Sequence, residues 1–144
     1  MSAVKFQTKS SSLWQCSLAT DVLSLPVSLP VHVIDTDGSA PFLFFSRPDD
    51  VVLSRVHRGC LSTLLSCLDA VSCCGQFPVV VITCMSTVLR MLDGQAGKDA
   101  VVRRVVECIL RGSGRAQVVV RVKSEQHKQL FDRYASFVCS CCVL

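Results

Sequence analysis

The sequence lacks the features that mark membrane-spanning, disordered and secreted proteins. No run reaches the roughly 18 consecutive apolar residues of a membrane-spanning helix, because Arg90 interrupts the longest candidate, Phe77 to Leu92. Charged residues make up only 18% of the chain and hydrophobic residues 50%, which excludes a disordered polyelectrolyte. Asp21 and two prolines interrupt the moderately apolar N-terminal stretch, so we expect no secretory signal.

The sequence also has little that points to nucleic acid or metal. Its net charge of +4 is modest and spread along the chain, so we expect no nucleic-acid partner. His32, His57 and His127 are scattered without metal-ligand or catalytic-triad spacing, and we expect no metal and no other cofactor. The ten cysteines are irregularly spaced and lack a secretory context, which favours reduced cytosolic thiols over disulfides.

What the sequence does have is an alternation of strand-like and helix-like segments. Apolar β-branched runs predict strands at 31–34, 78–84 and 116–122. Amphipathic spacing predicts helices from Asp49 to about Val71, from Asp99 to Gly112, and after Ser124 to about Val138. This order predicts an α/β fold with a mostly parallel central sheet flanked by helices. We expect one domain over residues 1–138 and a cysteine-rich tail over 139–144.

The tail ends in a prenylation signal. Cys141-Cys142-Val143-Leu144 has the C-a-a-X pattern, in which a cysteine four residues from the end takes the lipid and a terminal Leu favours geranylgeranyl. One lipid anchors weakly, and palmitoylation of Cys139 or Cys142 would supply a second signal. We therefore expect the protein at the cytoplasmic face of a membrane, held by a lipid on Cys141, with a cytosolic fraction. Otherwise, the apolar tail simply packs on the domain.

Cys84 and Arg90 have the C-x5-R spacing of cysteine-dependent phosphatases. That chemistry needs a thiol between a strand and a helix, where backbone N–H groups lower its pKa and bind a phosphate dianion. The arginine then clamps two phosphate oxygens with its planar fork. The alternative is that Cys84 is a small core residue and Arg90 a solvated helix residue.

Six further segments belong to one pattern with Cys84, Arg90 and the C-a-a-X box. They are Leu13-Trp14-Gln15-Cys16-Ser17-Leu18-Ala19-Thr20, Val31-His32-Val33-Ile34-Asp35, Asp37-Gly38-Ser39-Ala40-Pro41, Cys73-Cys74, Lys98-Asp99-Ala100-Val101 and Lys128-Gln129-Leu130-Phe131-Asp132-Arg133-Tyr134. In this order they resemble the prenylated type IVA protein tyrosine phosphatases, the "phosphatase of regenerating liver" family. The resemblance covers about residues 8 to 144, and the Asp37 segment is similar to the family's general-acid loop.

The resemblance implies a dual-specificity-phosphatase-like fold and a protein tyrosine phosphatase acting on phosphoproteins. Cys84 would form a phosphocysteine, Arg90 would bind the phosphate, and Asp37 would protonate the leaving oxygen. Cys16 would form a reversible disulfide with Cys84 and protect it from over-oxidation.

The sequence departs from the family at the phosphate-binding loop. Thr83 replaces the histidine before the nucleophile, and Thr87 replaces a glycine that lets the loop approach phosphate. The segment between Cys84 and Asp99 is several residues shorter, and the polybasic stretch before the lipid site is absent. Whether the chain is an active enzyme is therefore open. The second hypothesis is a lipid-anchored pseudophosphatase that binds partners without turnover.

A third hypothesis rests on Asp35-Thr36-Asp37-Gly38-Ser39. This segment matches the D-x-D-G-[ST] loop of haloacid-dehalogenase-type phosphatases. There Asp35 would attack phosphate and Asp37 would act as the acid, usually with Mg²⁺. That fold requires a downstream lysine and an acidic pair across a longer chain.

Overall fold

A computed structural model of the protein describes residues 3–4, 14–23, 30–40, 51–56, 60–74, 76–90, 92, 94–111 and 117–134. The C-a-a-X box with Cys141, the neighbouring Cys139 and Cys142, and the apolar run after Pro41 lie outside these residues. The predicted lipid anchor and the boundary at residue 138 therefore stay predictions.

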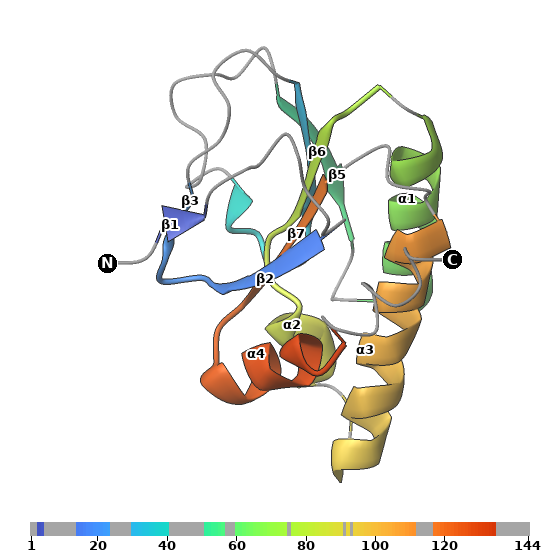
Figure 1. The fold of residues 1–144 in the computed structure, drawn as a ribbon. Coiled ribbons are helices and arrows are strands. Elements are labelled where there is room, and N and C mark those ends of the chain that lie inside the picture. Colours follow the sequence, from blue (N-terminus) through green and yellow to red (C-terminus); the bar gives the residue numbers. More distant parts are fainter. Residues whose placement is uncertain are drawn as a thin grey trace.

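Five parallel strands form the central sheet, in the order β2-β7-β6-β4-β5 (Figure 1). Their bounds are β2 (Trp14–Leu18), β4 (Val31–Asp35), β5 (Val51–Arg55), β6 (Val79–Ile82) and β7 (Gln117–Val122). Two short strands, β1 (Ala3–Val4) and β3 (Val22–Leu23), pair in a separate sheet. The prediction of an α/β fold with a mostly parallel sheet flanked by helices is confirmed.

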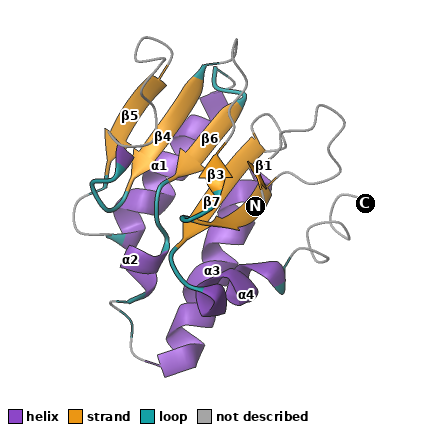
Figure 2. Ribbon diagram, turned by 90° about the vertical axis from the view of Figure 1, so that its left-hand side faces the viewer, coloured by secondary structure: helices purple, strands orange, loops and turns teal. Residues whose placement is uncertain are grey.

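Four helices lie among the described residues: α1 (Leu61–Cys74), α2 (Ser86–Leu89), α3 (Gly94–Arg111) and α4 (Glu125–Asp132). Figure 2 shows the strands in front of α1 and α3, which both cover the same face of the sheet. The predicted cap of the last helix is confirmed, since the Ser124 side chain accepts a hydrogen bond from the His127 amide. None of the described helices is long and apolar enough to cross a membrane.

Two predicted helix starts are wrong. The helix predicted from Asp99 begins at Gly94, so the glycine-containing segment before Asp99 belongs to α3. Periodicity predicted a helix from Asp49, but the structure has strand β5 over Val51–Arg55, and α1 begins only at Leu61. The reason is long-range pairing: the β-branched Val51 and Val52 align with Val31 and His32 of β4 and complete the sheet edge. Residues Leu64, Leu68 and Val71 do lie on the buried face of α1, as the spacing predicted.

The core has two layers because side chains alternate across each strand. Even-numbered strand residues face α1 and α3 in the larger cluster, which includes Ile34, Val80, Ile82, Val118 and Val120. Odd-numbered residues form a second cluster on the opposite face, including Val31, Val33, Val79, Val81 and Val119. Each fully buried aliphatic side chain contributes about 1.5–3 kcal/mol. Burial on both faces explains why the central strands are continuous apolar runs.

The edge strand β2 contacts two elements that come much later in the sequence, β7 and α4. Trp14, the only tryptophan, pairs with Val118 of β7 and contacts the ring of Phe131 edge-on, with centroids 6.1 Å apart. All strands end at the same edge of the sheet, where α2 and α4 lie (Figure 1). Ligands of parallel α/β sheets bind at this carboxyl edge.

Candidate functional site at the carboxyl edge of the sheet

Cys84 lies where the C-x5-R motif placed it, between the end of β6 and the start of α2. Its accessibility differs from the prediction. The residue is 0% exposed, whereas Arg90 at the end of α2 is exposed. Among the contacts of the described residues, none joins the side chain of Arg90 to Cys84. The structure therefore does not bring the predicted nucleophile and phosphate clamp together at one exposed point.

The segment after Cys84 is a helical turn, and four backbone donors in and beside it are bonded within the protein. The amides of Leu89 and Arg90 donate to the carbonyls of Met85 and Ser86, at 3.0 and 2.9 Å. The amide of Met85 donates to the Arg121 carbonyl at 2.7 Å, and the Cys84 amide donates to Thr36 Oγ1 at 3.1 Å. A phosphate cradle needs such N–H groups free to converge on one anion. In this conformation four of them donate to protein acceptors instead.

Thr36 fastens the end of β4 to the backbone of Cys84. Its hydroxyl accepts from the Cys84 amide and donates to the Cys84 carbonyl, while its own amide donates to Thr83 Oγ1 at 3.0 Å. Because Thr36 and Thr83 are 3% and 2% exposed, water does not compete for these bonds. These hydrogen bonds therefore join the residue that follows β4 to the residues that follow β6, just before the helical turn begins.

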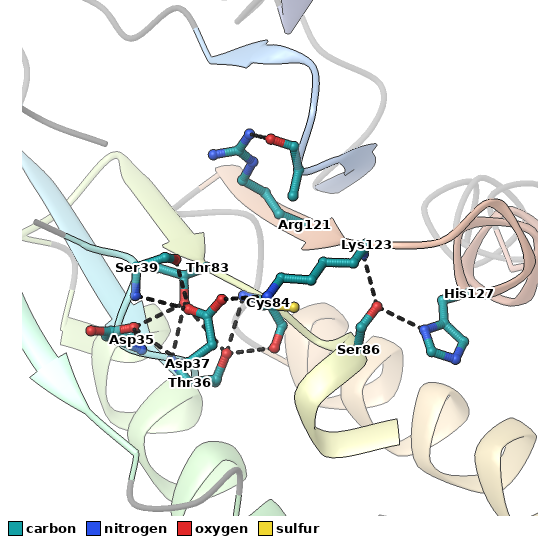
Figure 3. Close-up of polar contacts among 12 residues, drawn as sticks. Asp35, Thr36, Asp37, Ser39, Thr83, Cys84, Ser86, Arg121, Lys123 and His127 are labelled. Atoms are coloured by element: carbon teal, nitrogen blue, oxygen red, sulfur yellow. Dashed lines mark hydrogen bonds and ion pairs between the residues drawn. The ribbon is translucent and has the colours of Figure 1, made fainter. Parts of the chain in front are cut away.

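The carboxylate of Asp37 lies beside Thr83 and accepts hydrogen bonds from its neighbours (Figure 3). Its Oδ1 accepts from the Thr83 hydroxyl at 2.9 Å and from the Ser39 hydroxyl at 2.6 Å. Burial raises the pKa of Asp37, but hydrogen bonds from Ser39 and Thr83 and the charge of Lys123 outweigh it and lower the pKa below its usual value. Asp37 is consequently ionised at neutral pH, whereas the general acid of a phosphatase must carry a proton.

Asp35 supports the turn that follows β4. The residue is 2% exposed, and its Oδ1 accepts from the Gly38 amide at 2.7 Å and from the Asp37 amide at 3.2 Å. Gly38 has φ +81°, a conformation that side-chain-bearing residues rarely adopt. An attacking carboxylate of the haloacid-dehalogenase type must reach its substrate, and this one is buried in a turn. Within the described residues no group of three His, Cys, Asp or Glu is arranged to hold a metal ion, and Lys123 lies 3.6 Å from Asp37 Oδ2, so this pair does not fit Mg²⁺.

Sequence analysis missed a buried contact between Ser86 and His127. Ser86 is fully buried, and its Oγ lies 2.7 Å from His127 Nδ1 while it accepts from the Lys123 amide at 2.8 Å. Burial lowers the pKa of His127, and the charges of Lys98 and Arg90 lower it further. The tautomer of the neutral ring decides which of the two atoms donates in this hydrogen bond. The two residues are 41 positions apart, and no local pattern could have paired them. The contact joins α2 to α4.

Cys16 is too far from Cys84 for the disulfide that the resemblance implied. Cys16 aligns with Val120, which aligns with Ile82, so β7 lies between the two cysteine-bearing strands. Two strand spacings amount to about 9.5 Å, beyond the Cα separation of about 7 Å that a disulfide spans. Burial, then Asp132, raises the pKa of Cys16 to about 12. Cys16 is therefore a protonated thiol packed against the core in this conformation.

Among the cysteines whose side chains the structure describes, Cys60 is the exposed one. Hydrogen bonds from Ser62 and Thr63 lower the pKa of its thiol to about 7. It is the readily ionised thiol of this set, although it lies just before α1 and plays no part in the carboxyl-edge site.

No family model matches this chain, and no curated protein matches it, so no relative assigns a role to this site.

Proposed function

We propose that this protein is a phosphatase-like binding module without turnover, tethered to the cytoplasmic face of a membrane by a lipid on Cys141. The observation that carries the proposal is the helical turn from Met85 to Arg90 over a thiol that is 0% exposed. A cysteine nucleophile needs an accessible thiolate and a free anion cradle. In this conformation the Cys84 thiol is buried, and the amides of Cys84, Met85, Leu89 and Arg90 already donate to protein acceptors.

The residues that depart from the phosphatase motif support the proposal. Thr87 stands where the motif has glycine, and it lies inside α2, in a backbone conformation that any residue adopts. Thr83 stands where the motif has histidine, and its hydroxyl donates to a carboxylate instead. Both substitutions favour a rigid strand-to-helix connection over a flexible phosphate loop. The resemblance to a phosphatase then concerns the scaffold and the tail, and the partner would be a phosphoprotein recognised without hydrolysis.

An active protein tyrosine phosphatase using Cys84, Arg90 and Asp37 is the second candidate. One observation favours it: Cys84 lies at the carboxyl edge of a parallel sheet, directly before a helix, which is where this chemistry places its thiol. Activity would require Met85 to Arg90 to unwind and the thiol to become exposed.

Turnover of an aryl phosphate distinguishes the two candidates. The full-length protein, Cys84→Ser and Cys108→Ser should all release phosphate at the background rate; Cys108 is a comparably buried cysteine on α3. Turnover that Cys84→Ser abolishes and Cys108→Ser retains would overturn the proposal and establish the enzyme.

Membrane attachment is tested separately by cell fractionation. Cys141→Ser should move the protein from the membrane to the soluble fraction, because the C-a-a-X cysteine is the lipid acceptor. Cys139→Ser and Cys142→Ser test the second signal, and a smaller shift is expected for either palmitoylation site. An unchanged distribution of Cys141→Ser would refute the anchor.

A further inference from the structure

A row of polar side chains crosses the sheet on the face opposite α1 and α3. Strand register defines the row: Ser17 aligns with Arg121, and Asp35 aligns with Arg55. Thr83, one residue past the end of β6, continues the row between Arg121 and Asp35. All five are odd-numbered and lie at the carboxyl edge, above the apolar second cluster of the core.

At the β2–β7 end of this row, Ser17 Oγ, Arg121 Nε and Gln15 Nε2 are buried without a hydrogen-bond partner. Asp35 Oδ2, on β4, is also without one, but it is an acceptor on a carboxylate and offers an anion nothing. Ser17 and Arg121 are 6% and 3% exposed, and Gln15 lies two residues before Ser17 on the same face of β2. Buried polar groups are rarely left unpaired, and such a cluster in a native protein indicates an absent water or ion.

The positive charge of Arg121 favours an anion over a water molecule as the partner of these atoms. Its Nη2 donates to the carbonyls of Ala19 at 2.7 Å and Asp21 at 2.9 Å, and both acceptors are uncharged. Figure 3 shows the side chain extending away from Asp37, toward the turn after β2. Within the described part of the chain, no carboxylate lies within ion-pair distance of this guanidinium. A buried charge without a counter-ion is costly.

The negative charges around Arg121 do not offset the effect of burial on its pKa. Burial lowers the pKa of Arg121, while the charges of Asp21, Asp37 and Cys84 raise it, and the net direction is downward. A guanidinium nevertheless keeps its proton in proteins. The charge therefore persists, and among the described residues no carboxylate is in ion-pair contact with it. An ordered water would satisfy Ser17 and Gln15 but would leave that charge unbalanced.

We propose that Arg121, Ser17 and Gln15 form a buried anion-binding site for a phosphate-sized oxyanion. The guanidinium Nε–H, the amide and the hydroxyl supply donors, and the guanidinium supplies the balancing charge. The anion would be free phosphate or the phosphoryl group of a phosphopeptide, which share this chemistry. For a phosphopeptide, the site rests on the proposed function, because it would bind the phosphoryl group of the proposed phosphoprotein partner. It uses neither Cys84 nor Arg90, so its test with free phosphate stands whether or not the protein catalyses turnover.

Thermal unfolding of the full-length protein tests the proposal. Inorganic phosphate should raise the melting temperature saturably, and sodium chloride at equal ionic strength should not. Arg121→Met should weaken apparent phosphate affinity about tenfold or more, because it removes charge-assisted hydrogen bonds, and Arg121→Lys should retain part of the affinity. Arg104→Met is the matched control, since Arg104 is an exposed arginine on α3, and it should bind phosphate like the wild type.

A second measurement keeps the test valid if Arg121→Met fails to fold. In the wild-type protein, the Nε–H resonance of Arg121 should shift on phosphate titration, and Ser17→Ala should reduce the affinity. A phosphotyrosine peptide that produces the same shift would identify the phosphoryl source, and a shift with free phosphate alone would identify the ion. No shift with either, or equal stabilisation by chloride, would overturn the site.

Discussion

The two halves of the carboxyl edge differ in how completely their polar groups are bonded. At the β4–β6 half, Thr36, Thr83, Asp37 and the Cys84 backbone are joined by hydrogen bonds within the protein. At the β2–β7 half, Ser17, Gln15 and Arg121 keep buried atoms without partners. The half that carries the recognisable motifs is thus densely bonded, although Asp35 Oδ2 and His32 Nδ1 of β4 are buried without a partner. In the half without a motif, three donor-bearing side chains keep unused bonding capacity. Ligand binding is better sought where donors are still free.

The largest loss of stability should come from removing hydrogen bonds in the β4–β6 half. Thr83→Val keeps the side-chain shape but removes the hydroxyl that donates to Asp37 and accepts from the Thr36 amide. Leaving such buried groups unpaired should lower the free energy of unfolding by about 2 kcal/mol. Urea denaturation measures it. Thr87→Val is the control on the same segment, because Thr87 is only partly buried in α2, and equal losses for both variants would contradict the account.

Acidification should weaken the contact that joins α2 to α4. Burial lowers the pKa of His127, and also that of His32, below the usual 6.5. The unfolded chain then binds more protons than the folded one, so stability is complete above about pH 6.5 and falls as pH decreases below it. Asp37, whose pKa is below 3.8, contributes only at lower pH. Unfolding at pH 7.5 and 5.5 should show the loss, and His32→Gln/His127→Gln should flatten it. A slope unchanged in that double variant would refute this origin.

In the β2–β7 half, removing the charge of Arg121 should change the free energy of unfolding little. Arg121→Met replaces a buried guanidinium that bonds two carbonyls but no carboxylate with an apolar side chain of similar length. In a buffer free of phosphate and sulfate, the free energy of unfolding should stay within about 1 kcal/mol of the wild type, because loss of the charge offsets loss of the two carbonyl contacts. Chemical denaturation decides this. A loss as large as that of Thr83→Val would show that Arg121 is already stabilised within the protein.

The smallest effect should come from Ser17→Ala. The Ser17 hydroxyl has no partner, so its removal should change the free energy of unfolding by less than about 0.5 kcal/mol, or stabilise the fold slightly. Differential scanning calorimetry in phosphate-free buffer can resolve this change. Destabilisation beyond 1 kcal/mol, on the scale of a lost buried hydrogen bond, would mean that the hydroxyl has a partner, and the comparison of the two halves would fail.

Continuous β-branched runs made the sheet predictable from sequence. Val79 to Ile82 and Val118 to Val122 could only be buried strands, and Cys84 accordingly lies at a strand end. Strand β5 was missed because Val52 and Val56 also fit helical spacing, and only pairing with β4 decides between the two. Local patterns cannot reveal such long-range partners.

The sequence did not predict the contacts of the candidate site. It placed Cys84 at the end of a strand and Asp37 in a loop, but the hydrogen bond between Thr83 and Asp37 spans 46 positions. The burial of the thiol depends on that folded arrangement. One local signal was present and unused: Arg121 is a charged residue inside the apolar strand Gln117–Val122, and a buried charge of this kind marks a partner.

The pairing of β2 with β7 also determines how this protein must complete its folding. Trp14 is made early, yet its strand partner Val118 and its aromatic partner Phe131 are made near the end of the described chain. During synthesis, β2 therefore has to wait while the other strands assemble, and contacts this distant in sequence form slowly. Since Trp14 is the only tryptophan, its fluorescence reports the moment at which the two ends of the chain meet.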